Sequence, residues 1–422
     1  MSQRETRALG VRAQAMIDEL AAITAEPGKV MRLYLTPEHK RAADLVDGWM
    51  GNAGLTVRMD SAGTVHGLLA AARSGDLAAK RLLVGSHIDT VIDAGRYDGT
   101  FGVVAGILAA EQIRARGIAL PFALEILAFG DEEGVRYPTT LMSSSALAGS
   151  LNAGVLEMTD AAGVTLRSAL AAFGVDPERL TAEAYRRDDL IGYLEVHIEQ
   201  GPVLEQAGQP LGVVTAIASQ GRYRAHVRGE AGHAGTVPMA ARNDALAGAA
   251  EIIAAVEDVA RAGSRSSLVG TVGEIVVAPG ASNVIPGRAE FSIDVRATDD
   301  DTRLAAIAEI RQQAREIGQR RALAVAIETV HEKPVVLCSP RLMTAIAAAV
   351  RSVTGDAPPE LMSGAGHDGQ AMIHVTDIGM IFVRCRAGVS HNPLEFVSID
   401  DMGLSVEALV ETIVELAAEK AE

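Results

Sequence analysis

Short apolar runs alternate with helical patterns over the first half of the chain. A helix is expected to begin at Pro37, with Thr36 as its N-cap, and to continue through RAADLVDGWMGNAG. Strands are expected at 64–71, 81–85 and 122–129, and a further helix at 102–116. This alternation predicts an α/β sheet with helices on its faces, in which chemistry collects in loops beyond the strand ends.

The pattern changes around Val213. From there the chain predicts strand, helix, strand, strand, helix and strand, at 223–230, 244–262, 268–279, 288–297, 302–321 and 322–330. This order is typical of a ferredoxin-like unit. We therefore expect a discontinuous α/β domain of residues 1–212 and 333–422, with an α+β domain of residues 213–332 inserted into it. An amphipathic helix at 402–421 is expected to close the chain.

Charge and composition exclude several classes of protein. The 422 residues include 38 Lys and Arg against 54 Asp and Glu, a formal charge of −16, which argues against nucleic-acid and membrane partners. No apolar run approaches the roughly 20 residues that cross a bilayer, and the start, MSQRETRALGVRAQAMIDEL, resembles an amphipathic helix more than a signal peptide. We therefore expect a cytoplasmic protein.

The only cysteines, Cys338 and Cys385, are too few for a disulfide framework or a cysteine zinc site, so histidine and carboxylate would hold any metal.

Histidine and carboxylates follow predicted strands in two places. His87 and Asp89 follow the run RLLV, and Asp98 stands shortly before a helix. A histidine with a carboxylate to orient its second ring nitrogen is typical of metal sites. Glu132 and Glu133 follow the strand FALEILAF, where adjacent side chains diverge, so one could bind a metal and the other act as general base on a water. Taken alone, the first motif is equally well a polar loop, and the second is more often a charged turn.

Two more histidines extend this set. His197 lies in the alternating segment LEVHIEQGPVLE, and His391 lies in the loop GVSHNPLEF after the strand MIFVRC. A single strand histidine is more often structural. Together with His87, Asp98 and Glu133, however, the two could form a two-metal site that is bridged by Asp98 and shares a water. Nitrogen and oxygen ligands suit zinc, and they also suit manganese, cobalt or nickel.

As a set, the motifs resemble those of the M20-type amidohydrolases that act on ureido compounds, namely allantoate amidohydrolases, N-carbamoyl-L-amino acid hydrolases and β-ureidopropionases. The matching motifs span nearly the whole chain: TPEHKRAADLVDGWM, GSHIDTV, GRYDGTFGV, GDEEGVRYPTTL, HIEQGPVLE, GEAGHAGTVPM, SNVIPG, SGAGHD and GVSHNPLEF. The resemblance implies a mixed-sheet, metallo-exopeptidase-like catalytic domain with two divalent metal ions, zinc or manganese, with cobalt or nickel possible. The implied metal ligands are His87, Asp98, Glu133, His197 and His391, and Glu132 is the implied general base.

The resemblance also implies roles for the inserted domain. That domain would act as a lid and form a homodimer, and His233 would stabilise the oxyanion in the partner's active site. Without the resemblance, His233 is better interpreted as a loop histidine. Asn283 and Arg296 would contact substrate, since Arg296 could bind the carboxylate of a ureido acid through two hydrogen bonds and Asn283 offers a donor and an acceptor.

Other polar positions are weaker candidates. Gln200, Arg222 and the backbone at Gly364 and Gly366 are candidate substrate contacts, and Asp89 is the next candidate base after Glu132. The pair His367 and Asp368 is expected to support the ligands from a loop. Five histidines without a supporting motif are expected to be surface or structural residues: His39, His66, His226, His331 and His374.

The sequence thus favours a metal-dependent hydrolase that cleaves the ureido (carbamoyl) C–N bond of a small carboxylate substrate and releases ammonia and carbon dioxide. GDEEGVRYPTTL is slightly more similar to allantoate amidohydrolases than to carbamoylases. An N-carbamoyl-L-amino acid hydrolase or β-ureidopropionase is the near alternative, and an M20 deacylase or dipeptidase a more distant one. A non-catalytic binder of small molecules on the same scaffold is disfavoured, because it has no need of a base such as Glu132 beside a metal.

Overall fold

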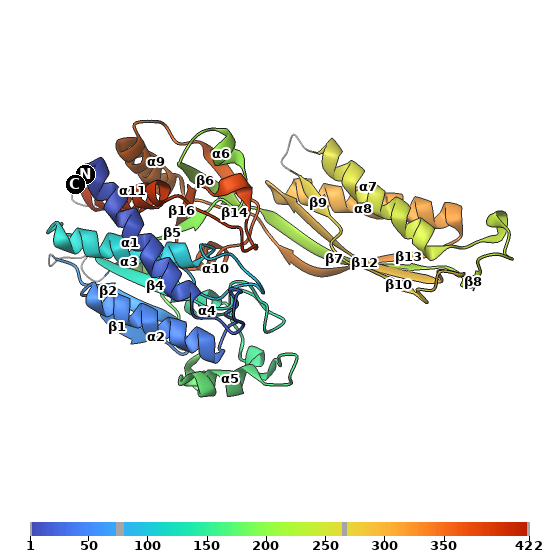
Figure 1. Cartoon of the computed structure of the whole chain (residues 1–422), viewed down its shortest axis with the longest axis horizontal. Coiled ribbons are helices and arrows are strands. Elements are labelled where there is room, and N and C mark those ends of the chain that lie inside the picture. The colour runs from blue at the N-terminus through green and yellow to red at the C-terminus, as the bar shows by residue number, and fades with distance from the viewer. Residues whose placement is uncertain (1, 73–79, 264–267, 420–422) are drawn as a thin grey trace. The chain divides into compact units, whose positions relative to one another are not determined.

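The computed structural model describes residues 2–72, 80–263 and 268–419. The chain divides into two compact units, which we call unit 1, Met1–Thr215 with Leu337–Glu422, and unit 2, Ala216–Val336 (Figure 1). Within the described ranges, no helix is long and apolar enough to cross a membrane.

A mixed sheet forms the centre of unit 1. Its nine strands in the described part of the chain follow the order β1-β2-β4-β3-β5-β16-β6-β14, with β15 paired to β6. The central strands β4, β3, β5 and β16 are parallel, whereas β2 and β6 pair antiparallel on either side. The strands are β1 Thr56–Met59, β2 Val65–Leu69, β3 Arg81–His87, β4 Ala123–Phe129, β5 Leu190–Ile198, β6 Leu211–Ile217, β14 Val336–Leu337, β15 Glu360–Ser363 and β16 Ile378–Val383.

Apolar helices cover this sheet. Helix α3 packs on β3, β4 and β5, while α9 and α11 pack on β16, and α1 lies beside α11 although the two come from opposite ends of the chain (Figure 1). The core runs continuously through these helices and the central strands. The helices are α1 Gln3–Ala21, α2 Pro37–Asn52, α3 Thr100–Ala115, α4 Met142–Leu147, α5 Leu166–Phe173, α6 Val203–Gln206, α9 Pro340–Thr354, α10 Gly369–Met372 and α11 Ile399–Glu419.

Unit 2 has its own sheet and its own core. The sheet order is β10-β12-β7-β13, with β9 paired to β12, and α7 and α8 pack on it. A separate two-stranded pair joins β8 to β11. The elements are β7 Ser219–Arg228, β8 Gly232–His233, α7 Ala245–Ala262, β9 Val269–Thr271, β10 Ile275–Ala278, β11 Val284–Ile285, β12 Arg288–Ala297, α8 Asp300–Arg321 and β13 Ala324–Lys333.

The structure confirms the mixed α/β architecture and differs from the expected elements in detail. Thr36 caps α2 through a hydrogen bond to the His39 amide, with Pro37 in the first turn, as expected. The strand expected at 268–279 is two short strands, β9 and β10. The closing helix begins at Ile399 rather than 402, and residues 420–421 of the expected helix lie outside the described residues.

Candidate metal centre

Parallel strands bring the candidate ligands to one edge of the unit 1 sheet. His87 is the last residue of β3, level with Phe129 at the end of β4, and the Glu132–Glu133 turn follows β4 directly. His197 lies one residue before the end of β5, level with Phe382 of β16. Because the carboxyl ends of parallel strands share one edge, these side chains and the loop after β16 converge there.

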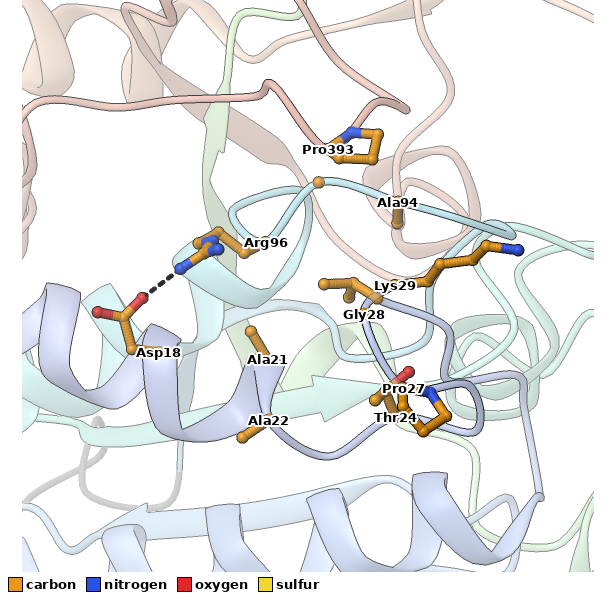
Figure 2. Close-up of a pocket in the computed structure, with 12 residues that line it drawn as sticks. Asp18, Ala21, Ala22, Thr24, Pro27, Gly28, Lys29, Ala94, Arg96 and Pro393 are labelled. Atoms are coloured by element: carbon orange, nitrogen blue, oxygen red, sulfur yellow. Dashed lines mark hydrogen bonds and ion pairs between the residues drawn. The ribbon is translucent and has the colours of Figure 1, made fainter.

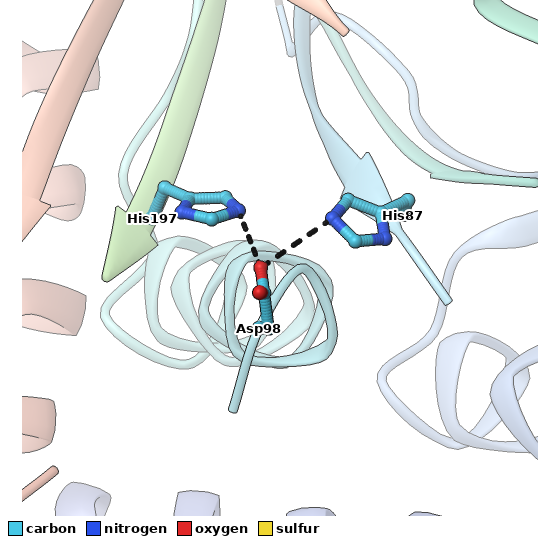
Figure 3. A group of neighbouring side chains, drawn as sticks. All are labelled: His87, Asp98 and His197. Carbon is cyan, nitrogen blue, oxygen red and sulfur yellow. Dashed lines mark ion pairs between the residues drawn. The ribbon is translucent and has the colours of Figure 1, made fainter. Parts of the chain in front are cut away.

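Asp98, just before α3, lies at the centre of this group. Its Oδ1 lies 3.2 Å from Nε2 of His197 and 3.7 Å from Nε2 of His87 (Figure 3). Its Oδ2 lies 3.2 Å from Nε2 of His391, which is 3.5 Å from Oε1 of Glu133. The result is two groups of possible metal ligands that share the Asp98 carboxylate, His87–Asp98–His197 and Asp98–Glu133–His391.

The histidine tautomers in this group suit a cation. Nδ1 of His87 lies 3.1 Å from the carbonyl oxygen of Asp89, and Nδ1 of His197 lies 2.9 Å from that of Ile198. A carbonyl only accepts, so each Nδ1 carries a hydrogen, and each Nε2 faces the Asp98 carboxylate. A divalent metal ion would take the place of protons on the Nε2 atoms, and this set of nitrogen and oxygen ligands fits such an ion.

The pKa shifts of the buried groups at this centre also indicate a site for positive charge. Burial, reinforced by the charges of Asp98 and Glu132, raises the pKa of Glu133 well above its usual range. Burial also opposes ionisation of Asp98, but hydrogen bonds from His197 and His391 hold its pKa well below the usual range. For His197, burial lowers the pKa and the Asp98 contact more than compensates, so the pKa rises to about 9. The buried carboxylates of Asp98 and Glu133 lie close together, so both can be ionised only if positive charge lies beside them.

Asp89 holds the turn that carries the two glutamates. The buried Asp89 carboxylate accepts the Glu132 amide at Oδ1 and the Glu133 amide at Oδ2, each at 3.2 Å. Glu132 and Glu133 each offer a carboxylate oxygen to a third group of possible ligands with His87. Asp89 thus fixes the direction in which both glutamate side chains leave the backbone. From the sequence, the Asp89 carboxylate was expected to orient only His87.

Gln200, a predicted substrate contact, lies against Asp98. Its Nε2 donates to Asp98 Oδ2 at 2.8 Å and to the hydroxyl of Ser390 at 3.1 Å. His367, in the SGAGHD loop, lies next to this group, since its Nε2 lies 2.6 Å from Ser363 Oγ and its ring packs edge-on against His197. Gly364, in the same loop, is exposed.

Sequence reasoning missed Gln370, which follows this loop in α10. Its amide Oε1 is buried and has no hydrogen-bond partner among the described residues. A methyl group at Gly366 would lie 3.1 Å from this oxygen and 3.5 Å from Oε1 of Glu132, so both oxygens lie close to the Gly366 backbone. A buried amide oxygen without a partner can accept a hydrogen bond from an N–H donor. The available signal was a polar side chain two residues after His367–Asp368.

Comparison with known proteins agrees with this geometry. The model of the peptidase family M20/M25/M40 matches residues 83–415. The chain belongs to this family. An allantoate deiminase of Arabidopsis thaliana is 42% identical over 427 residues, which cover 94% of this chain and 81% of that protein. An N-carbamoyl-L-amino acid amidohydrolase of Geobacillus stearothermophilus is 39% identical over 409 residues, covering 97% and 98%. The crystal structure of a hydantoinase/carbamoylase family amidase from Burkholderia multivorans has a TM-score of 0.87 at 31% identity, covering 97% and 98%.

In this M20 protein, the predicted residues of unit 2 lie in two separate places. Arg296 on β12 is held by Asp294, Nε to Oδ1 at 2.9 Å and Nη2 to Oδ2 at 3.2 Å, and the exposed Arg222 of β7 reaches the same carboxylate at 3.3 Å. His233 and Asn283 are both exposed, and the amide after His233 donates to the Asn283 carbonyl at 3.0 Å. His233 and Asn283 adjoin the start of β12, whereas Arg296 is near its end.

A pocket of about 600 Å³ in unit 1 adjoins the loops that carry Asp98 and His391 (Figure 2). Gly95, Arg96 and Pro393 belong to its wall, where Arg96 forms an ion pair with Asp18 at 2.7 Å. Among the described residues that line it, none is a candidate metal ligand. The pocket is therefore distinct from the candidate metal centre of this M20 protein.

Proposed function

We propose that this M20 protein is a metal-dependent amidohydrolase that cleaves a ureido C–N bond of allantoate and releases ammonia and carbon dioxide. The observation that carries the proposal is the group of candidate ligands around Asp98, with Glu132 beside them at one sheet edge. The Arabidopsis thaliana relative named for allantoate shares 42% identity with the chain, and the Geobacillus stearothermophilus relative named for N-carbamoyl-L-amino acids shares 39%. N-carbamoyl-L-amino acids are accordingly the alternative substrates.

The ligand arrangement supports a site for two divalent ions, zinc or manganese. His87 and His197 would hold one ion, Glu133 and His391 the other, and Asp98 would be shared by both. Bound there, such ions would polarise the ureido carbonyl and lower the pKa of a water. The direction of the histidine Nε2 atoms and the burial of Asp98 support this assignment.

Glu132 is positioned to move the proton. Its carboxylate would take a proton from the attacking water, whose oxygen forms a bond to the ureido carbon, and would then deliver the proton to the nitrogen that leaves as the C–N bond breaks. Asp89 holds the turn on which this depends. Gln370 Oε1, which lies close to Gly366 as Glu132 Oε1 does, would accept an N–H of the ureido group and so orient it.

Arg296, Asn283 and His233 are proposed to bind the rest of the substrate, on the basis of the family resemblance. Asp294 supports this role for Arg296 because it fixes the plane of the guanidinium. With Arg296 on the substrate carboxylate, Asn283 would bind an amide and His233 would donate a hydrogen bond to the developing oxyanion.

The length of β12 supports a homodimer in which His233 acts in the partner's site. The nine residues of strand from Arg288 to Arg296 span about 27 Å, so Arg296 and His233 of one chain lie too far apart to contact the same small substrate. Two copies of the chain would solve this, with Arg296 from one and His233 from the other. Mixing inactive Glu132→Gln and His233→Ala proteins by co-refolding should then restore about one site in four, since half the dimers are mixed and each has one intact site. No recovery in confirmed heterodimers would exclude this arrangement.

The reaction itself is tested by measuring ammonia release from allantoate, N-carbamoyl-L-amino acids and β-ureidopropionate side by side. We expect the highest kcat/KM with allantoate. Glu132→Gln should retain bound metal and lose roughly 10²- to 10⁴-fold in kcat, whereas Glu133→Ala should lose metal as well. Absence of ammonia release from every ureido substrate by the metal-loaded protein would refute the proposal.

A further inference from the structure

Glu395 lies beside the metal centre and makes a specific set of contacts. Its side chain is buried, and Oε1 accepts the backbone amides of Tyr97 at 2.8 Å and Asp98 at 3.1 Å. Its other oxygen, Oε2, accepts the hydroxyl of Ser390 at 3.0 Å. One carboxylate therefore joins the loop that carries Asp98 to the loop that carries His391.

The Ser390 hydroxyl extends this link to the candidate ligand itself. It lies 2.9 Å from Asp98 Oδ2 as well as 3.0 Å from Glu395 Oε2, so its single proton serves two carboxylates, and it accepts from Gln200 Nε2. Asp98 is thus held at both ends, with Glu395 on its backbone amide and Ser390 with Gln200 on its side chain. Both the position and the direction of the shared carboxylate are fixed in this way.

The local sequence of both loops accommodates Glu395. A Cβ at residue 95 would overlap the Glu395 carboxylate, so Gly95 is needed for the close approach of the two loops. On the other side, Asn392 forms a turn in which its side chain accepts the Leu394 amide at 2.9 Å and its carbonyl accepts the Glu395 amide at 3.0 Å. This turn directs Glu395 back towards Tyr97 and Asp98.

The cost of burying the Glu395 carboxylate next to Asp98 indicates that Glu395 acts together with the candidate metal group. Among the described residues, the hydrogen-bond donors to Glu395 are two amides and one hydroxyl, all neutral. A buried carboxylate that shares a proton donor with a second carboxylate is costly unless positive charge is close. The candidate metal group on the far side of Asp98 is the place where such charge would bind.

We propose that Glu395 is a positioning residue that locks the Asp98 loop to the His391 loop, so that ligands from both loops are preset for metal. This inference rests on the proposed function, because it presumes that the group around Asp98 holds metal. Glu395 touches neither substrate nor metal in this role, and it acts through the backbone of Asp98 and the hydroxyl of Ser390.

The test measures metal affinity directly, by competition between the purified protein and a chromophoric zinc chelator. Glu395→Ala removes all three hydrogen bonds and should weaken zinc binding by roughly 10- to 100-fold, the usual effect of losing a group that orients metal ligands. Glu395→Gln should restore most of the affinity, since its Oε1 can accept both amides and its Nε2 can donate to Ser390. Glu395→Asp keeps the charge but is one methylene shorter, so it should bind zinc weakly.

Glu205→Ala is the matched control. Glu205 also anchors the segment before His391, by accepting the Ala387 amide at 2.9 Å, but it contacts neither Asp98 nor Ser390. Its replacement should leave zinc affinity unchanged. If Glu395→Ala fails to fold, the comparison of Glu395→Asp with Glu395→Gln decides the matter.

The outcomes separate this inference from the proposed function. Wild-type protein that binds no zinc, manganese, cobalt or nickel would refute both. Wild-type protein that binds zinc, with Glu395→Ala or Glu395→Asp binding equally well, would refute only the role of Glu395. Equal weakening by Glu205→Ala would also refute it, because any loss of loop anchoring would then have the same effect.

Discussion

Replacement of Asp89 by Asn tests whether the Glu132–Glu133 turn must be held in place. Asp89 is 2% exposed, and its two oxygens each accept one backbone amide of the turn at 3.2 Å. Asparagine has nearly the same shape, but it replaces one acceptor with an NH2 donor. One amide of the turn therefore faces a donor instead of an acceptor.

The expected magnitude follows from that single change. Leaving one buried donor unsatisfied costs about 1–3 kcal/mol. If this free energy acts entirely against the conformation of the turn that places Glu132 and Glu133, the population of that conformation falls by roughly 5- to 150-fold, and kcat/KM falls with it. Zinc affinity should fall in the same direction, because Glu133 leaves the same turn.

The assay compares kcat/KM for ammonia release and zinc affinity in wild type, Asp89→Asn and a control, Asp93→Asn. Asp93 lies in the same loop at a positive φ of 56°, a conformation that asparagine tolerates, and it is not bonded to the turn. The control should match wild type. A kcat/KM within twofold of wild type for Asp89→Asn, in protein of normal stability, would refute the argument that Asp89 sets the turn.

Three further predictions concern unit 2, metal removal and a buried histidine. Arg296→Lys should lower kcat/KM by roughly 10-fold or more, since an ammonium cannot reproduce the planar guanidinium that Asp294 holds; the loss should shrink for an analogue whose carboxylate is an amide. Chelation should abolish activity and lower the urea midpoint, because a ligand at 100 times its Kd adds about 2.7 kcal/mol to the native state, and added zinc or manganese should reverse both effects. Burial lowers the pKa of His66, but its hydrogen bonds to Asp60 and Glu125 outweigh burial and raise it. The resulting stability is fully present below the unfolded pKa of 6.5 and is lost as pH rises through the raised folded pKa, so the urea midpoint of wild type should fall with rising pH above 6.5 relative to His66→Gln.

Several of the candidate ligands could be predicted from the sequence because they stand at or just after the end of a recognisable strand. RLLV before His87 and FALEILAF before Glu133 are apolar enough to be recognised as buried strands, and parallel strands align their carboxyl ends. Convergence of His87, Glu133 and His197 at one edge then follows from topology alone. The sequence also predicted Asp98 as a bridging carboxylate, and the structure adds its distances to three histidines.

The contacts that hold these ligands could not be predicted, because they join residues far apart in the chain. Glu395 and Asp98 are separated by 297 positions, and Gln200 and Asp98 by 102. Nothing in the spacing of GVSHNPLEF indicates that its glutamate turns back onto another loop. For the same reason, the sequence placed Gln200 near the substrate but did not indicate its hydrogen bond to Asp98.

Some helices and strands could not be predicted from the hydrophobic pattern of the sequence. Helix α4 is the six residues MSSSAL, a short stretch of small and polar side chains that no apolar period marks. Helix α5 was not predicted either, although its buried Leu166, Ala169, Leu170 and Phe173 follow a helical spacing. The segment 268–279 looked like one strand because both of its halves are apolar. It divides in the structure, since β9 pairs with the end of β12 and β10 with its beginning.

The buried acids of unit 1 connect these observations with the proposed function. Burial raises the pKa of Asp131 well above its usual range, and the oxygens of its carboxylate have no hydrogen-bond partner among the described residues. Burial likewise raises the pKa of Glu195, which lies behind His197. A fold optimised only for stability would replace such groups, since uncharged residues of similar volume cost nothing to desolvate. Their concentration at the sheet edge that carries Asp98 and Glu133 is reasonable if that edge evolved to bind cations, because a bound divalent ion lowers the cost of every carboxylate around it.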